Sequence, residues 1–443
     1  MCGSQEPHFL YIIKYYIHET SKGKYLYMIK TKKLDCGVTL VTEKLPDLQA
    51  ACLGIWVGAG SAYEDKSING ISHFIEHMFF KGTKTRTYKQ IAEDMDNLGA
   101  QFNAFTGKEY TCFYAKGISE EFPKICDILF DMLCNSLFDS NEMKKERGVI
   151  LEEMRMSEDT PDEYAVDLIS EAVFTGSDLA PAVIGTRKAL KGIEREDILK
   201  YIKKQYVLDH MVVAVCGNYN ESTLVSQINS YFGCFVKTKK DRKLTLPDGK
   251  CRYISKAKDI MQSHLALAVP TISLADDAYY VQSVVNEVLG GSMSSLLFQN
   301  IREEKGLAYT VYSSPMAYTT SGCLFIYAGV SLGSEKLAIE GIAEELEKLG
   351  KNGITQEQLD VVRKRLKAGF IFSLERLESR MIRLGRNQLL LGEVRNQKQI
   401  MKELDAVKLS SVNEFARQIS DITKYSAACV SRNKVDLRSL ING

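Results

Sequence analysis

The amino-acid sequence predicts an α+β protein built from two homologous domains, each with a mainly antiparallel β-sheet packed against helices. The chain has 443 residues, more than one hydrophobic core ordinarily serves. Runs with the period-2 pattern of strands alternate in blocks with runs of helical periodicity. The order of these runs in the first half returns in the second half at a roughly constant offset. This repetition indicates an internal duplication with a period near a whole domain.

The composition is that of an ordinary folded protein, with 45% hydrophobic and 26% charged residues. Its 57 basic and 56 acidic residues leave a net charge of +1, so no global field favours nucleic acid or an anionic membrane. No apolar run reaches the roughly 18 residues of a membrane helix. We therefore expect neither a nucleic-acid partner nor a membrane partner.

The cysteines and the N-terminus both bear on the compartment. The 11 cysteines are scattered without a C-x-x-C pair, and their odd number argues against a disulfide framework and a cysteine zinc site. The N-terminus offers no clean apolar core with a cleavage site, as a secretory signal would. Together these features predict a cytoplasmic protein.

The repeat and the charge pattern divide the chain into four segments. Residues 1–33 lack a periodic pattern and are expected to form a loose extension, of which residues 1–27 should be dispensable. The first domain is expected at 34–236 and the second at 253–443. The segment between them is charged, carries Pro and Gly and shows no apolar face, so residues 237–252 are expected to be the linker.

The elements of the first domain follow from local patterns. Two β-rich runs at 37–45 and 50–60, joined by a Pro-Asp turn, predict a hairpin. The run at 99–117 changes its alternation near Thr106 and predicts a second strand pair. A capping box of Asp139 and Glu142 begins one of the helices. Helices are expected at 69–80, 88–98, 119–135 and 139–153 and onward to about 205, and a buried strand at 211–216.

The first of these helices carries His73, Glu76 and His77 in the order H-x-x-E-H. Residues four apart on a helix lie one turn above each other, so both imidazoles point to one place with Glu76 beside them. Two imidazoles suit zinc, and a carboxylate that is not a ligand can take a proton from water at the metal. The alternative is a core helix with two incidental histidines. With only six histidines in the chain, and unpaired imidazoles costly on an apolar helix, metal binding is favoured.

A catalytic zinc takes three protein ligands, so another element should supply the third. The run ERGVILEEM contains Glu146, Glu152 and Glu153. Glu146 and Glu153 are seven residues apart and share a helix face, whereas Glu152 is rotated away by about 100°. The residues alone rank Glu146 and Glu153 above Glu152 and leave the choice between those two open.

The second half repeats the order of the first without its histidines. Where the metal motif would stand, the sequence reads Glu-Val-Leu-Gly-Gly at 287–291. One half is therefore expected to carry the metal, and the other to have a different role. The repeated elements are a strand at 263–270, a helix at 278–289, strands at 306–314 and 322–330, a helix at 335–349 and a further helix capped by Thr355 and Gln358.

These motifs resemble those of the pitrilysin and insulysin family of zinc peptidases, peptidase family M16, and in particular its shorter members similar to the mitochondrial processing peptidase. The resemblance covers about residues 34–443. The family has H-x-x-E-H followed by a glutamate some 76 residues after the second histidine, which matches His77 and Glu153. The resemblance therefore implies one zinc ion per chain on His73, His77 and Glu153, with Glu146 as a carboxylate that supports a ligand.

Two further motifs of the family have counterparts here. Its G-A-x-x-N-A-x-T run appears at 99–106, and there it implies an edge strand that pairs with the backbone of an extended peptide. Asn103 and Ala104 are the substrate-binding residues that this match implies. The family also uses an arginine and a tyrosine seven residues apart, matched by Arg302 and Tyr309. The resemblance implies that both serve catalysis by facing the scissile carbonyl oxygen, where negative charge develops.

The resemblance thus implies a zinc-dependent endopeptidase that hydrolyses peptides or extended polypeptide segments in a closed chamber, with Glu76 activating the water. The alternative is a noncatalytic partner or scaffold subunit of a processing-peptidase-like complex. Such subunits have eroded motifs, whereas every motif position here is filled. Long family members fold four such domains around a chamber, and this chain supplies two. A homodimer with shared sites is therefore expected, each site taking zinc from one subunit and Arg302 and Tyr309 from the other.

Overall fold

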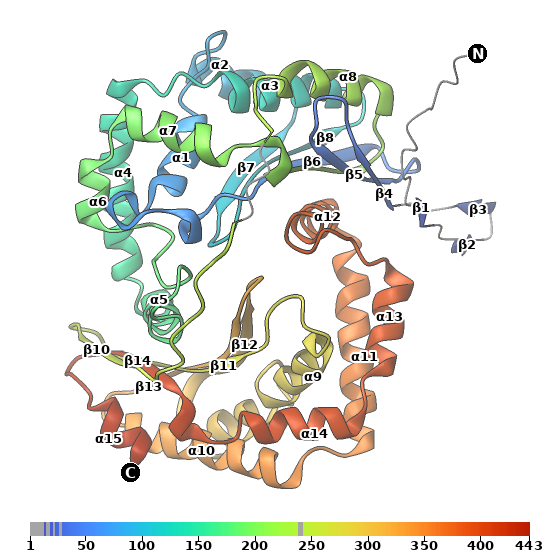
Figure 1. Cartoon of the computed structure of the whole chain (residues 1–443). Coiled ribbons are helices and arrows are strands. Elements are labelled where there is room, and N and C mark those ends of the chain that lie inside the picture. The colour runs from blue at the N-terminus through green and yellow to red at the C-terminus, as the bar shows by residue number, and fades with distance from the viewer. Residues whose placement is uncertain (1–12, 15–17, 21–22, 26–28, 238–241) are drawn as a thin grey trace, which may run out of the picture.

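The computed structural model describes residues 13–14, 18–20, 23–25, 29–237 and 242–443. Two halves, each a β-sheet with helices packed on it, lie one above the other in Figure 1. The predicted α+β class with two similar domains is confirmed. Among the described residues, no helix is long and apolar enough to cross a lipid bilayer.

The first half is built on a seven-stranded sheet in the order β1-β4-β5-β9-β6-β8-β7. Strands β5 and β9 are parallel, and the other neighbours in this sheet are antiparallel. Strand β7 therefore has one hydrogen-bonded neighbour and forms an edge of the sheet. The strands are β1 (Ile13–Lys14), β4 (Ile29–Lys33), β5 (Thr39–Lys44), β6 (Ala50–Val57), β7 (Gln101–Thr106), β8 (Thr111–Ile118) and β9 (Met211–Gly217), and a separate pair is β2 (His18–Thr20) with β3 (Gly23–Tyr25).

The hairpin expected from 37–45 and 50–60 is wrong. Strands β5 and β6 both form, but β9 lies between them and pairs with each. All seven residues of β9 are buried, as expected for a strand covered on both faces, and such a strand takes a central place in a sheet. The turn between β5 and β6 shows that they are consecutive in the sequence. It cannot show that β9, which begins only at Met211, lies between them in the sheet.

The boundary expected at residue 34 is also wrong. Residues Ile29–Lys33 form β4, which pairs antiparallel with β5 and belongs to the first sheet. The side chains of Lys32 and Lys33 form ion pairs with Glu221 and Asp209, so a polar strand is held beside the sheet without an apolar pattern to predict it. The rest of the expected extension falls mostly outside the described residues. Of the expected linker, residues 242–252 are in neither a helix nor a strand.

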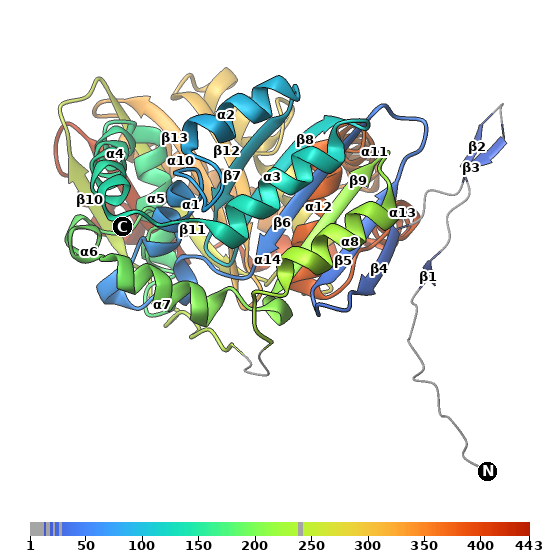
Figure 2. The ribbon, with the colours of Figure 1, turned by 90° about the horizontal axis from the view of Figure 1, so that it is seen from above.

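The helices of the first half agree with the expected ones to within a few residues. Figure 2 shows α3 and α8 lying together across one face of the sheet, where they bury a large apolar core. Helices α1 and α4 pack against each other at the end of the sheet near β7. The helices are α1 (Ile71–Phe79), α2 (Tyr88–Asn97), α3 (Phe122–Asn135), α4 (Ser140–Glu158), α5 (Pro161–Val173), α6 (Arg187–Gly192), α7 (Arg195–Gln205) and α8 (Glu221–Phe232).

The second half repeats this topology. Its sheet has the order β10-β14-β11-β13-β12, with β10 and β14 parallel and the remaining neighbours antiparallel, as in β5-β9-β6-β8-β7. The strands are β10 (Tyr253–Ala257), β11 (Gln262–Thr271), β12 (Ala308–Ala317), β13 (Gly322–Ser331) and β14 (Ser426–Ser431). The helices are α9 (Tyr279–Leu289), η4 (Phe298–Glu304), α10 (Glu335–Asn352), α11 (Gln356–Ser373), α12 (Leu377–Leu391), α13 (Gln397–Ala406), α14 (Leu409–Gln418) and α15 (Leu437–Asn442).

The two halves exchange helices. Helix α12 of the second half packs on the first sheet against β5, β6 and β9, and α5 of the first half packs on the second sheet (Figure 1). Buried Trp56 meets α12 closely: its Nε1 lies 3.4 Å from the Met381 sulfur, and a Cβ added at Gly385 would lie 2.0 Å from that same Nε1. Each sheet therefore needs the other half to bury one of its faces.

Candidate metal centre

Helix α1 presents its polar motif because its apolar residues point into the core. Phe74, Ile75 and Met78 are fully buried, which leaves the histidines on another face. The helix begins after Gly70, whose φ of 98° favours glycine. Because glycine offers no capping side chain, Glu64 takes that role and accepts hydrogen bonds from the backbone N–H of Gly70 at 2.6 Å and of Ser72 at 2.8 Å.

His73, His77 and Glu153 come together where α1 meets α4. Each residue has one donor atom within 4.8 Å of the corresponding atoms of the other two, and the described residues contain no other such cluster. His73 Nε2 lies 3.7 Å from Glu153 Oε1, and His77 Nε2 lies 3.5 Å from Glu153 Oε2. Zinc bonds to imidazole nitrogen and carboxylate oxygen at about 2.0–2.1 Å, which separates neighbouring ligand atoms by roughly 3.3 Å around a tetrahedral ion. The three side chains therefore fit a zinc ion with one position left open.

Glu146 stands behind the cluster and orients His77. Its buried carboxylate lies 3.2 Å from His77 Nδ1 and accepts a 2.7 Å ion pair from Lys81. A carboxylate at Nδ1 keeps the proton on that nitrogen, so the lone pair of Nε2 faces the cluster. Glu152 is 60% exposed and pairs with Arg155 instead. The structure thus places Glu153 beside both imidazoles, Glu146 behind one of them and Glu152 away from both.

The two histidines have opposite pKa shifts. Burial, with a smaller contribution from neighbouring His77, lowers the pKa of His73 to about 4, so this imidazole is neutral near pH 7. Burial acts in the same direction on His77, but its hydrogen bonds to Glu153 and Glu146 raise its pKa overall. The hydrogen bond to His77 in turn lowers the pKa of Glu153. These carboxylates create a local negative potential that suits a cation.

Glu76 lies on the same side of α1 but outside the cluster. Its carboxylate accepts a hydrogen bond from the hydroxyl of Thr106, the last residue of β7. Burial raises the pKa of Glu76 and the bond from Thr106 opposes that shift. A carboxylate with a raised pKa beside a metal site is suited to accept a proton and pass it on.

Asn103 and Ala104 lie on the edge strand β7, which contacts α1. The side chain of Asn103 is exposed, and its oxygen accepts a 2.8 Å hydrogen bond from the backbone N–H of Ala104. The Ala104 side chain is buried. An edge that passes the metal helix is placed to pair with an extended chain.

Arg302 and Tyr309 lie in the second half, on η4 and at the start of β12. The guanidinium carbon of Arg302 is 5.4 Å from the centre of the Tyr309 ring and 4.7 Å from that of Phe298. The pair lines a cavity of about 350 Å³, and Tyr309 is 74% exposed. None of their described hydrogen bonds, ion pairs or ring contacts reaches His73, His77 or Glu153 of the same chain. The structure brings these two residues together but does not join them to the histidines.

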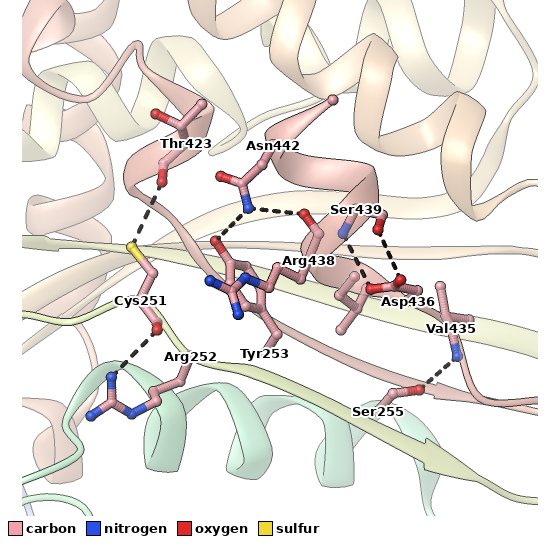
Figure 3. Close-up of a pocket in the computed structure, with 12 residues that line it drawn as sticks. Cys251, Arg252, Tyr253, Ser255, Thr423, Val435, Asp436, Arg438, Ser439 and Asn442 are labelled. Carbon is pink, nitrogen blue, oxygen red and sulfur yellow. Dashed lines mark hydrogen bonds between the residues drawn. The ribbon is translucent and has the colours of Figure 1, made fainter.

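A larger cavity, of about 1120 Å³, lies between β10 and α15 (Figure 3). Its polar groups bond to one another: Asp436 caps α15 through Ser439, and Asn442 donates to the Arg438 carbonyl at 2.9 Å. The cavity lining contains no histidine. These bonds hold the last helix in place, so the size of the cavity does not make it the reactive site.

Sequence reasoning missed the contacts of Thr106, Lys81 and Glu64. Thr106 stands in the matched 99–106 run, and that match was the signal available for it. Its partner Glu76 lies 30 positions earlier in the chain, and nothing local connects the two. Neither Lys81 nor Glu64 belongs to a recognised motif, and their partners appear only when α4 and the segment before α1 are in place.

Comparison with known proteins adds independent information on the family. A family model described as "Insulinase (Peptidase family M16)" matches residues 39–187, and one described as "Peptidase M16 inactive domain" matches residues 192–366. The candidate ligands His73, His77 and Glu153 lie in the first matched range, and Arg302 and Tyr309 lie in the second.

Among curated relatives, the "Uncharacterized zinc protease YmxG" of Bacillus subtilis is 41% identical over 404 residues, covering 91% of this chain and 98% of the relative. An "Uncharacterized zinc protease" of Rickettsia felis is 33% identical over 411 residues, covering 92% and 98%. Among solved structures, a protease from Helicobacter pylori superposes with a TM-score of 0.84 at 21% identity, over 92% of this chain and 100% of that one. A peptidase M16 inactive domain from Pseudomonas fluorescens gives 0.83 at 18% identity, over 91% and 98%. The chain therefore belongs to peptidase family M16, the insulinase family.

Proposed function

We propose that this protein is a zinc-dependent endopeptidase that hydrolyses peptides or extended segments of polypeptides. The observation that carries the proposal is the convergence of His73, His77 and Glu153 beside the half-buried carboxylate of Glu76. The names of two relatives support it, since those of Bacillus subtilis and Rickettsia felis are both named zinc proteases. The edge strand beside this cluster supports an extended peptide as the substrate.

His73, His77 and Glu153 would hold one zinc ion per chain. When bound, zinc supplies Lewis acidity at the scissile carbonyl and lowers the pKa of water beside it. The neutral imidazole of His73 offers its nitrogen without first losing a proton. Glu146 would keep His77 in the tautomer that offers Nε2 to the three-residue site, and the ion pair with Lys81 holds the Glu146 carboxylate in place.

Glu76 moves the proton in this scheme. The water oxygen bonds to the carbonyl carbon, and Glu76 accepts the proton that the water releases. When the carbon–nitrogen bond breaks, Glu76 delivers that proton to the leaving amine. One carboxylate thus serves both steps and returns to its starting state. Its half-buried position and the raised pKa of its carboxyl suit Glu76 to each role.

The substrate backbone would add to the edge of β7 at Asn103 and Ala104, since β-augmentation holds a peptide extended with little regard to its side chains. Arg302 and Tyr309 would donate to the carbonyl oxygen as negative charge develops on it. Within one chain these two residues do not contact the metal cluster. We therefore propose that two copies form a closed chamber with two shared sites, each joining the metal cluster of one subunit to Arg302 and Tyr309 of the other.

Cleavage of an internally quenched peptide tests the proposal. Purified protein should cleave it, a chelator should abolish the cleavage and added Zn²⁺ should restore it. Glu76→Gln is the matched control, because the amide cannot accept the proton but leaves all three proposed ligands in place. Cleavage that resists chelation, or full activity in Glu76→Gln, would refute the mechanism.

A further inference from the structure

The hairpin formed by β7 and β8 contacts Glu76 at one point and the other half of the molecule at another. At the end of β7, the Thr106 hydroxyl donates to the Glu76 carboxylate. The neighbouring Thr111 hydroxyl lies 3.4 Å from that of Thr106, but it donates to the Ala59 carbonyl at 2.8 Å. Of these two hydroxyls, that of Thr106 therefore donates to Glu76, and this hydrogen bond holds one oxygen of the carboxylate in position.

The turn that follows Thr106 is tied to the second half by Glu109. The carboxylate of Glu109 is 1% exposed and accepts hydrogen bonds from the Thr319 backbone N–H at 3.1 Å and from the Thr319 hydroxyl. Thr319 lies in the turn between β12 and β13, the counterpart of the turn between β7 and β8. The two equivalent hairpin tips thus meet at a buried, charge-assisted contact between the halves.

The same turn is also held from its own half. The carbonyls of Gly107 and Lys108 accept hydrogen bonds from the N–H groups of Ser61 at 3.3 Å and Ala62 at 2.8 Å. Burial raises the pKa of Glu109, and the bonds from Thr319 and the charge of Arg386 on α12 oppose that shift. The turn is therefore held by two sets of hydrogen bonds, one to Ser61 and Ala62 in its own half and one from Thr319 of the second half to Glu109.

We propose that Thr106 and Glu109 are positioning residues through which the half without metal holds the Glu76 carboxylate in place. Thr319 fixes Glu109, Glu109 fixes the turn, and the turn fixes the Thr106 hydroxyl on Glu76. The inference rests on the proposed peptidase function, because it assigns Glu76 the role of proton acceptor. A catalytic group must be held within about 0.5 Å of its productive position, and misplacement by about 1 Å can cost roughly a hundredfold in rate.

The first experiment replaces the Thr106 hydroxyl. Thr106→Val keeps the shape of the side chain and removes the donor, so kcat should fall by about tenfold to a hundredfold while KM and zinc content stay near those of wild type. Thr106→Ser keeps the donor and should restore most of kcat. An unchanged kcat in Thr106→Val overturns the role of Thr106.

The second experiment breaks the contact from each side and measures structure as well as rate. Glu109→Gln and Thr319→Val should both speed hydrogen–deuterium exchange of the β7 amides, and both should lower kcat by about tenfold. Thr320→Ala is the matched control, since it lies in the same turn and its buried hydroxyl has no hydrogen-bond partner. The control should match wild type in both measurements.

The exchange measurement separates this inference from the proposed function. If wild type cleaves no peptide, the proposed function fails, yet faster β7 exchange in both variants still supports the tie between the halves. Exchange equal to wild type overturns the inference whether or not peptides are cleaved. Faster exchange with an unchanged kcat overturns the positioning role and leaves a purely structural contact.

Discussion

The same pair of helices meets in both halves of the molecule, but with different chemistry at the contact. In the first half α1 and α4 bring two imidazoles and a carboxylate together. In the second half α9 and α11 meet through an ion pair in which Arg365 Nε lies 3.1 Å from Glu287 Oε1. An ion pair joins α9 and α11 in the second half. In the first half, three side chains that could bind a cation lie where α1 meets α4.

The second half is also tightly packed where its counterpart of the motif ends. Its counterpart of the motif ends in Gly290 and Gly291, where an added Cβ would lie 2.3 Å from the Ser313 nitrogen and 2.5 Å from Glu287 Oε2, respectively. No side chain of useful size fits there without movement. Both halves keep the helix contact, but among the described residues only the first half carries the candidate ligand set of His73, His77 and Glu153. One scaffold thus presents two different sets of side chains at the same place.

The largest effect should follow removal of a proposed ligand in the first half. In His73→Ala, zinc should fall from about one ion per chain to nearly none, and activity should fall by on the order of a thousandfold or more, since Lewis acidity contributes several kcal/mol. Metal analysis by mass spectrometry and peptide cleavage measure the two effects. Retention of zinc in this variant would show that His73, one of the residues that distinguish the first half from the second, is not needed to hold the metal.

Next in size is the effect of removing the proposed proton acceptor, Glu76. Glu76→Gln should retain about one zinc per chain and lose roughly a hundredfold to ten-thousandfold in turnover, because the amide cannot accept a proton. The same two assays apply. Loss of zinc together with activity would instead make Glu76 part of the cluster that holds the metal.

Mixing two damaged chains tests whether the halves of different subunits cooperate. Glu76→Gln and Tyr309→Phe chains, each nearly inactive, would be unfolded and refolded together. With shared sites, each mixed dimer has one intact site, so random pairing should restore about a quarter of wild-type activity. If mixing restores nothing, the Arg302 and Tyr309 pair acts within its own chain or not at all, and the shared-site proposal is wrong.

The exchange of helices between the halves predicts a smaller, purely structural effect. In Gly385→Ala the new Cβ would lie 2.0 Å from Trp56 Nε1, so overpacking should lower the free energy of unfolding by about 1–3 kcal/mol. Gly369→Ala in α11 is the control, because its added Cβ would have no atom within 4 Å beyond its chain neighbours and its own helix backbone. It should stabilise the helix by about 1 kcal/mol. Chemical denaturation measures both. Equal stabilities would mean that α12 shifts freely on the first sheet.

The smallest effect should come from the ion pair of the second half. Arg365 is 44% exposed, so Arg365→Ala should change the free energy of unfolding by no more than about 1 kcal/mol and leave the zinc content unchanged. Denaturation and metal analysis check this expectation. A change in zinc content would show that the contact between α9 and α11 influences the one between α1 and α4. The two contacts would then not be independent, contrary to our expectation.

Much of the fold and part of the site could be predicted because the signals are local. Helical periodicity placed α1 to within a few residues, and the repeat in the order of elements indicated two similar halves. The spacing of His73 and His77 placed both on one face of α1, since residues four apart always share a face. The choice between Glu146 and Glu153 stayed open, because seven residues on a helix keep both on one side and only the packing of α4 on α1 distinguishes them.

The sequence by itself therefore determined the elements, their duplication and the faces that they present. The tertiary structure alone decided which elements become neighbours: β9 separates β5 from β6, α5 and α12 cross to the opposite sheets, and Thr106 reaches Glu76. The physical reason is range. Periodicity, capping and turn chemistry act over a few residues, whereas neighbours across a sheet or between halves depend on where a distant segment packs to bury its apolar face.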